Sequence, residues 1–155
     1  MDFDPNTFLT QRTTGDFTKR PPIPAGLEIV GVIGTELKAR KAVNKEDPTV
    51  EYVFLDIPIK LDLTTSTTAR KAVGADNITL IHGVRLDFTP SGVLDNSPGK
   101  NPGLRQYREA LKLTAEHGVN DFGIWDLAGR IVKCKISHRE YQGEQYDQIA
   151  SVTRP

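Results

Sequence analysis

The clearest pattern in the chain is an alternation of aliphatic and other residues from Val53 to Leu63. A period of two predicts a half-buried β-strand whose aliphatic side faces a core. The opposite side carries Tyr52, Phe54 and Lys60. Proline has no backbone N–H, so Pro58 places the second half of this strand at a sheet edge or a bulge.

Two further stretches, one before and one after this strand in the sequence, also predict strands. Residues 26–37 are mainly aliphatic but contain Gly31 and Gly34, which indicates a long first strand with a strong bend. The polar residues 39–49 that follow are expected to form a turn. Residues 78–88 alternate again, and Arg85 lies opposite the aliphatic face.

Helical signals are concentrated in two places. Residues 64–75 are compatible with a short helix or a loop, and the sequence favours neither. Asn101 is a good N-cap and Pro102 suits the first helical position. One helix face would then carry an apolar stripe, and Gly118 would end the helix. The stripe comprises Leu104, Tyr107, Leu111 and Ala115.

The last third of the chain predicts a β-hairpin. Residues 131–141 would pair with residues 145–152 across a Gln142-Gly143 turn. One face of the first hairpin strand is apolar and contains Val132, Cys134 and Ile136. The other face contains Lys133, Lys135, Arg139 and Tyr141.

The order of these elements predicts a mainly β protein with one or two helices. Strand, strand, strand, helix, strand, strand is the order of the OB-fold, a five-stranded Greek-key barrel. We expect the barrel to span residues 26–155. Residues 1–25 form an irregular arm, because prolines at positions 5, 21, 22 and 24 interrupt regular structure.

Composition narrows the classes of protein that fit. The chain has 20 Lys and Arg against 20 Asp and Glu, so no net charge steers it toward nucleic acid. One cysteine excludes a disulfide framework within one chain. There is no apolar run of membrane-spanning length and no signal-peptide pattern. These features lead us to expect a cytoplasmic protein without a membrane partner.

Catalytic motifs are absent from the sequence. It contains no G-x-S-x-G, no P-loop and no G-x-G-x-x-G. Cys134 and His138 would lie about 13 Å apart on a strand, too far to share a metal ion. We therefore expect a protein that is not an enzyme and that holds no metal and no cofactor.

Binding of single-stranded nucleic acid is the function that the residue types favour. Aromatic side chains stack on bases, and cations follow the phosphates. Both kinds of residue lie on the non-aliphatic faces of the predicted strands. The alternative is that these are ordinary solvent-exposed sheet faces and that Tyr52 and Phe54 pack under the N-terminal arm. The barrel would then be a protein-interaction module. The candidate site consists of Tyr52, Phe54, Lys60, Arg85, Lys133, Lys135, Arg139 and Tyr141.

An ordered set of short patterns over residues 23–153 resembles a family of phage-encoded proteins catalogued as a domain of unknown function. The patterns include Ile23-Pro24-Ala25-Gly26, Ile81-His82-Gly83-Val84, Asn101-Pro102-Gly103-Leu104, Leu127-Ala128-Gly129, Val132-Lys133-Cys134-Lys135-Ile136 and Tyr141-Gln142-Gly143. Members of this family are regarded as OB-fold single-stranded DNA-binding proteins. The resemblance implies single-stranded DNA binding in phage replication or recombination, in the host cytoplasm, with phage or host replication proteins as partners.

Overall fold

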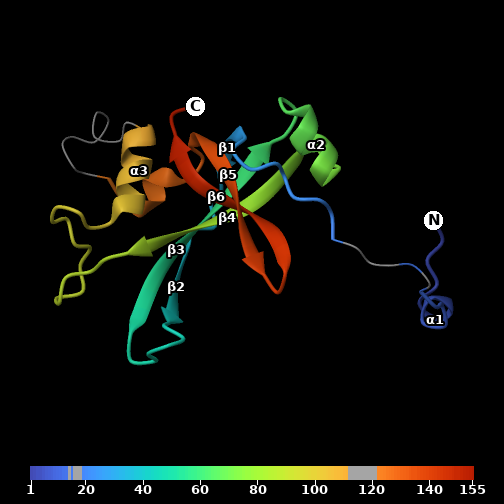
Figure 1. The fold of residues 1–155 in the computed structure, drawn as a ribbon, viewed down its shortest axis with the longest axis horizontal. Coiled ribbons are helices and arrows are strands. Elements are labelled where there is room, and N and C mark those ends of the chain that lie inside the picture. Colours follow the sequence, from blue (N-terminus) through green and yellow to red (C-terminus); the bar gives the residue numbers. More distant parts are fainter. Residues whose placement is uncertain (14, 16–18, 112–121) are drawn as a thin grey trace.

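The protein is built on a six-stranded antiparallel sheet with few helices (Figure 1). The computed structural model describes residues 1–13, 15, 19–111 and 122–155. The strands are β1 (Glu28–Ile33), β2 (Lys38–Val43), β3 (Glu51–Asp62), β4 (Asn77–Leu86), β5 (Ile131–Tyr141) and β6 (Glu144–Thr153). The helices are α1 (Pro5–Phe8), α2 (Thr67–Val73), α3 (Pro102–Leu111) and the 3₁₀ helix η1 (Ile124–Leu127). The predicted mainly β class is confirmed.

The long central strand β3 organises the sheet. Its partners are β2 and β1 along one edge and β4 along the other. The strand order is β2-β3-β1-β5-β6, with β4 attached to β3. The ends β4 and β6 approach one another, but no ladder between the described strands closes the sheet.

The predicted polar turn at residues 39–49 is wrong in its first half, where β2 forms. Neither face of β2 is buried, so it lacks the aliphatic alternation that identified β3. Lys38, Arg40 and Lys41 are typical of an edge strand protected by charge. The turn itself is short, and Asn44 N–H donates to the Val50 carbonyl at 2.9 Å.

The prediction that Pro58 marks a sheet edge or bulge is also wrong, since β3 is paired on both sides. Pro58 lies opposite Ile81 of β4, and on the other side its carbonyl accepts a 2.8 Å hydrogen bond from Gly34. The N and C=O of one strand residue point to the same side. The missing N–H therefore faces residues 34–37, where the chain passes from β1 to β2 and no ladder partner is needed.

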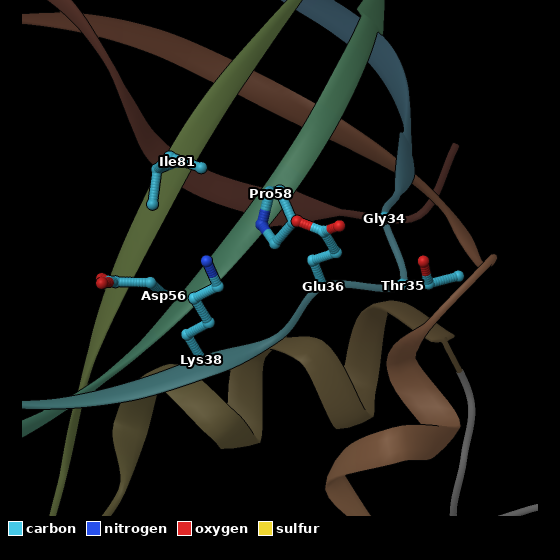
Figure 2. Close-up of a pocket in the computed structure, with 7 residues that line it drawn as sticks. All are labelled: Gly34, Thr35, Glu36, Lys38, Asp56, Pro58 and Ile81. Atoms are coloured by element: carbon cyan, nitrogen blue, oxygen red, sulfur yellow. The ribbon is translucent and has the colours of Figure 1, made fainter.

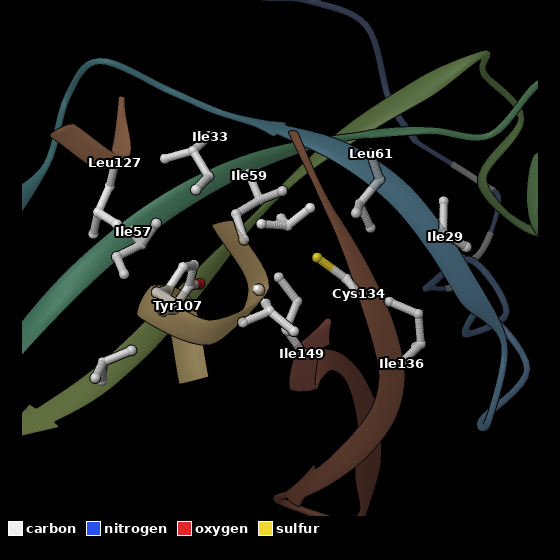
Figure 3. Close-up of a cluster of buried hydrophobic side chains, with 14 of the residues drawn as sticks. Ile29, Ile33, Ile57, Ile59, Leu61, Tyr107, Leu127, Cys134, Ile136 and Ile149 are labelled. Carbon is white, nitrogen blue, oxygen red and sulfur yellow. The ribbon is translucent and has the colours of Figure 1, made fainter. Parts of the chain in front are cut away.

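The core gathers buried side chains from β1, β3 and β5 together with Tyr107 of α3 (Figure 3). The alternation predicted for β3 is confirmed, because Leu55, Ile57, Ile59 and Leu61 are all buried. Val132, Cys134 and Ile136 of β5 are buried as expected. At Gly31, a Cβ atom would come within 2.6 Å of the Ile59 side chain, so the close approach of β1 and β3 requires glycine.

Helix α3 packs against β4, β5 and β6 and covers one end of the core. Leu104 and Tyr107 are buried and Leu111 is partly buried, in agreement with the predicted stripe. A Cβ at Gly103 would lie 2.4 Å from Val84, which fixes how closely the helix meets β4. The predicted stripe residue Ala115 and the predicted stop Gly118 lie outside the described residues.

Asn101 precedes α3 as predicted, but its side chain serves a different purpose from capping. Its Oδ1 atom accepts from the Asp87 N–H at 2.8 Å, and its Nδ2 atom donates to the carbonyls of Asp87 and Asp95 at 2.9 and 3.0 Å. The residue is buried and has a positive φ of 48°. Asn101 therefore joins the end of β4 to the following loop.

The two remaining local predictions have clear outcomes. Residues 64–75 contain a helix, α2, whose N-cap Ser66 accepts from Ala69 N–H at 3.3 Å. The hairpin of β5 and β6 turns at Gln142 and Gly143, both with positive φ, as a two-residue type I′ turn requires. In the described part of the chain, no helix is both long and apolar enough to cross a bilayer.

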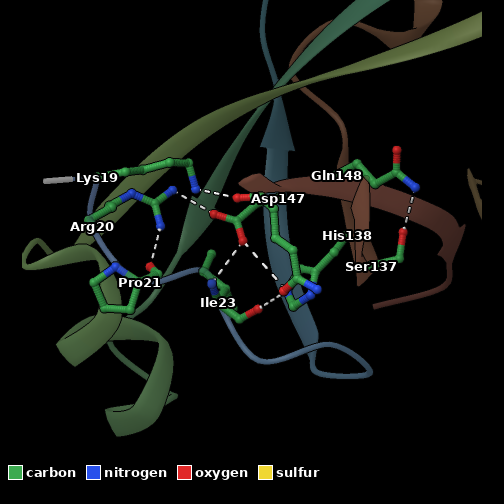
Figure 4. A network of polar contacts seen from close by, with 9 residues as sticks. Lys19, Arg20, Pro21, Ile23, Ser137, His138, Asp147 and Gln148 are labelled. Atoms are coloured by element: carbon green, nitrogen blue, oxygen red, sulfur yellow. Dashed lines mark hydrogen bonds and ion pairs between the residues drawn. The ribbon is translucent and has the colours of Figure 1, made fainter. Parts of the chain in front are cut away.

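The end of the N-terminal arm is attached to the β5–β6 hairpin (Figure 4). The nearly buried carboxylate of Asp147 accepts from Arg20 at 2.6 Å and from the Ile23 N–H at 2.8 Å. His138 Nε2 donates to the Ile23 carbonyl at 2.5 Å, and Lys19 donates to the carbonyl of Gln145. Residues 19–23 of the arm are thus held by β6 and β5, away from the β3 aromatics.

Candidate nucleic-acid interface

Aromatic and cationic side chains meet on the outward face of β2, β3 and β4. Phe54 of β3 lies between Arg40 of β2 and Arg85 of β4 in the strand register. Tyr52, two residues earlier, projects from the same face. The adjacent β3 residues Val53 and Leu55 point to the core side, so the alternation of β3 alone determines which side chains reach this surface.

An arginine guanidinium group lies over each of the two rings. The Arg40 guanidinium carbon lies 4.6 Å from the centroid of the Phe54 ring, and that of Arg85 lies 4.3 Å from the centroid of Tyr52. The Tyr52 hydroxyl also accepts from Asn44 Nδ2 at 3.3 Å. Both distances between guanidinium and ring are within the range of cation–π contacts. These two pairs are referred to below as the arginine–aromatic face.

The Arg40 guanidinium contacts a carboxylate as well as the Phe54 ring. Its Nε atom donates to Asp56 Oδ2 at 2.7 Å, and half of its side chain remains exposed. A Cβ at Gly83 would lie 3.4 Å from an Arg40 guanidinium nitrogen and 3.4 Å from Asp56 Oδ1. The guanidinium therefore extends across β3 as far as β4, and Gly83 leaves room for it.

A shallow groove of about 500 Å³ adjoins the arginine–aromatic face (Figure 2). It is lined by residues 34–36, which connect β1 to β2, and by side chains of three strands. Asp56 belongs to both the groove and the Arg40 ion pair. The strand residues of the groove are Lys38, Asp56, Pro58 and Ile81.

Lys60, Lys133 and Lys135 form a second group around β1. Lys60 lies opposite Val32 of β1, and Val32 lies opposite Ile131 of β5. Lys133 and Lys135 follow Ile131 on the same outward face of β5. Lys60 is six residues from Phe54 along β3, or about 20 Å. One carboxylate, Glu28, lies 3.8 Å from the Lys133 ammonium group.

Arg139 and Tyr141 form a third group near the tip of the β5–β6 hairpin. Arg139 lies opposite Tyr146, and its guanidinium carbon is 5.3 Å from that ring's centroid. Lys19 of the arm approaches the same ring at 4.6 Å. This group therefore repeats the pairing of an aromatic ring with cations, at a distance from β3.

All eight predicted site residues project from the outward faces of their strands, but the structure distributes them over three groups. It brings together Tyr52, Phe54 and Arg85. Arg40 is not among the predicted residues, because the sequence pattern assigned it to a turn. No residue of β2 is fully buried, so no alternation in the sequence marked the position of Arg40. Tyr146 was also missed, and only the hairpin register places it beside Arg139.

Exposed apolar side chains lie on this sheet surface within the second group and on β4. Val32 and Ile131 face one another across β1 and β5 and are 44% and 50% exposed. Ile81 of β4 is 57% exposed beside Pro58. Such a patch is a feature of binding surfaces for bases or for proteins.

Cys134 and His82 lie on the core side of the sheet and not on this surface. Burial raises the pKa of the Cys134 thiol to about 12, so the thiol is not activated as a nucleophile. Burial also lowers the pKa of His82 to about 4. Within the described ranges, no group of three or more His, Cys, Asp and Glu side chains could hold a metal ion.

Comparison with known proteins gives no family: no family model and no curated protein matches this chain. The function is therefore inferred from the residues and their geometry.

Proposed function

We propose that this protein binds single-stranded DNA through the arginine–aromatic face, without catalysis and with weak sequence preference. The observation that carries the proposal is the pairing of Phe54 with Arg40 and of Tyr52 with Arg85 on one exposed sheet surface. Aromatic rings and guanidinium groups can stack on any base, and cations attract phosphates. The resemblance to phage proteins suggests phage replication or recombination as the setting.

The strand order supports an OB-type barrel as the framework for this function. If β1 and β2 are the two halves of one bent first strand, then β3 and β4 are the second and third strands of the OB-fold. The β5–β6 turn is then the loop between its fourth and fifth strands. Those elements are where OB-folds bind oligonucleotides. The arginine–aromatic face includes residues of β3 and β4, and Arg139 and Tyr141 lie beside the β5–β6 turn.

The test is fluorescence anisotropy with a labelled oligo(dT) over a series of salt concentrations. We expect saturable binding at micromolar protein that weakens as salt rises, because phosphate contacts release counterions. Arg85→Ala should weaken binding. Lys71→Ala, which removes the same charge from exposed α2, is the matched control and should bind like the parent. A parent protein that shows no salt-dependent binding would refute the proposal.

A protein-interaction module is the second candidate. The exposed pair of Val32 and Ile131 favours it, because apolar side chains at the centre of a sheet face are well suited to contact another protein. The two functions predict different sensitivities. Val32→Ser should abolish association with a protein partner, whereas oligo(dT) binding centred on Phe54 should change little.

A further inference from the structure

We propose that the Arg40 guanidinium is itself a base-stacking surface, supported from beneath by Phe54 and held in position by Asp56. This inference rests on the proposed function and assigns a distinct role within that site. The sequence patterns pointed to Phe54 as the stacking group. In the folded protein, the guanidinium of Arg40 lies over that ring and would meet a base first.

Two contacts and the space beside Gly83 fix the position of this guanidinium. The Phe54 ring lies 4.6 Å away, Asp56 accepts from Nε at 2.7 Å, and the absence of a side chain at Gly83 leaves space for the terminal nitrogen. A planar group held at its edge and supported on one face presents its other face to solvent. The 50% exposure of the Arg40 side chain is consistent with such a free face. Guanidinium planes are established partners for stacked bases.

The ion pair argues against Arg40 acting mainly as a phosphate contact. Asp56 already neutralises much of its charge, and a phosphate would have to compete with that carboxylate. Arg85 provides the contrast within the same surface. In the described part of the structure Arg85 contacts the Tyr52 ring but has no carboxylate partner. Arg85 is therefore the better phosphate contact of the two, and Arg40 the better stacking surface.

Substitution by lysine separates these roles, because lysine retains the charge but has no plane to stack. The probes are oligo(dT) and an abasic oligonucleotide of equal length, which keeps the phosphates and lacks the bases. For Arg40→Lys we expect roughly a fivefold or greater loss of affinity for oligo(dT), the lower range for one stacked base. Affinity for the abasic probe should stay within about twofold of the parent. Arg85→Lys, the matched control, should preserve the parent's ratio between the two probes.

Asp56→Asn tests the positioning role. Removal of this negative charge should strengthen binding to both probes through the phosphates, so the informative quantity is the ratio of the two affinities. If Asp56 orients the guanidinium, the preference for oligo(dT) over the abasic probe should fall. Thermal melts must first show that each variant is folded.

The possible outcomes separate this inference from the proposed function. A parent that binds both probes equally, or an Arg40→Lys variant that keeps the parent's preference for oligo(dT), would overturn the stacking role and leave single-stranded DNA binding intact. An unchanged ratio in Asp56→Asn would overturn the positioning role. A parent that binds neither probe would overturn the proposed function and this inference together.

Discussion

The hydroxyl of Tyr107 on α3 lies 2.6 Å from Nδ1 of His82 on β4, in a hydrogen bond that links helix and sheet at the edge of the core. Tyr107 is fully buried, and the two rings are in contact with centroids 5.6 Å apart. The alternation of β4 places His82 on the same face of the strand as Ile78, Leu80 and Val84. Only packing of α3 against β4 supplies the partner for its imidazole.

The burial of His82 makes stability depend on pH. Burial lowers the pKa of His82 to about 4 from 6.5, so the unfolded chain binds a proton more readily than the folded protein. The stabilising contribution is complete above about pH 6.5 and decreases as pH falls toward 4. Between pH 7 and pH 5 we expect a loss of about 1–2 kcal/mol from this residue. Urea unfolding at both pH values would measure it.

The control for this prediction is His82→Gln, which cannot titrate. Carboxyl groups also contribute to acid destabilisation, so the difference between parent and variant isolates the histidine. Equal pH dependence in the two proteins would show that His82 is not protected from protonation.

Asn101→Ala should destabilise the protein by more than the loss of an ordinary helix cap. The substitution removes three side-chain hydrogen bonds at a buried position and takes these partners from the Asp87 N–H and the Asp95 carbonyl, while the Asp87 carbonyl keeps its hydrogen bond from the Asp95 N–H. We expect a decrease of about 2–4 kcal/mol in the free energy of unfolding, against about 1 kcal/mol for a simple cap. Chemical denaturation of the parent and the variant would show which of these two losses of stability occurs. Asn96→Ala in the same loop, at an exposed position, serves as the control.

Phe54→Ala should weaken oligo(dT) binding by about 1–3 kcal/mol, the usual effect of removing one aromatic stacking group. The effect arises because the ring supports Arg40 and contributes its own area to the surface. Phe88→Ala is a suitable control, since Phe88 is exposed beyond the end of β4. Anisotropy titrations of folded variants would measure both effects. Parent-like affinity in Phe54→Ala would remove this ring from the site.

The double substitution Lys133→Ala with Lys135→Ala tests whether the path of the bound DNA extends to β5. These side chains lie on the outward face of β5 beyond the exposed Val32–Ile131 pair. For every phosphate that the variant no longer neutralises, the slope of log affinity against log salt should become shallower by about 0.7. An unchanged slope would limit the interface to the arginine–aromatic face and the hairpin tip.

Asp147→Asn should release the end of the N-terminal arm. The substitution removes the charge that holds Arg20 at 2.6 Å and weakens the acceptor for the Ile23 amide. Hydrogen exchange of the Ile23 N–H should accelerate at least tenfold if its opening becomes easier by about 1.4 kcal/mol. Glu140→Gln on the exposed end of β5 is the charge-matched control. Unchanged exchange at Ile23 would mean that the buried side chain of Ile23, not Asp147, holds the arm.

Strands and helices that bury one face could be predicted from the sequence alone. The alternation in β3, the apolar stripe on α3 and the Gln142-Gly143 turn are local patterns, and each appears where the sequence predicts it. Such patterns are readable because a buried face demands apolar residues at a fixed period. The aromatic residues of the candidate site could be identified for the same reason, as the exceptions on the opposite face.

Features that depend on neighbours distant in sequence arise only in the folded protein. Strand β2 has no buried face, so its existence and the position of Arg40 follow only from pairing with β3. Pro58 is tolerated inside β3 because β1 and β2 separate beside it. Asn101 and Asp147 obtain their roles from partners on other segments. The same pairing divides the eight predicted site residues into three groups, because a strand's sequence fixes which face a side chain takes but not which strand lies next to it.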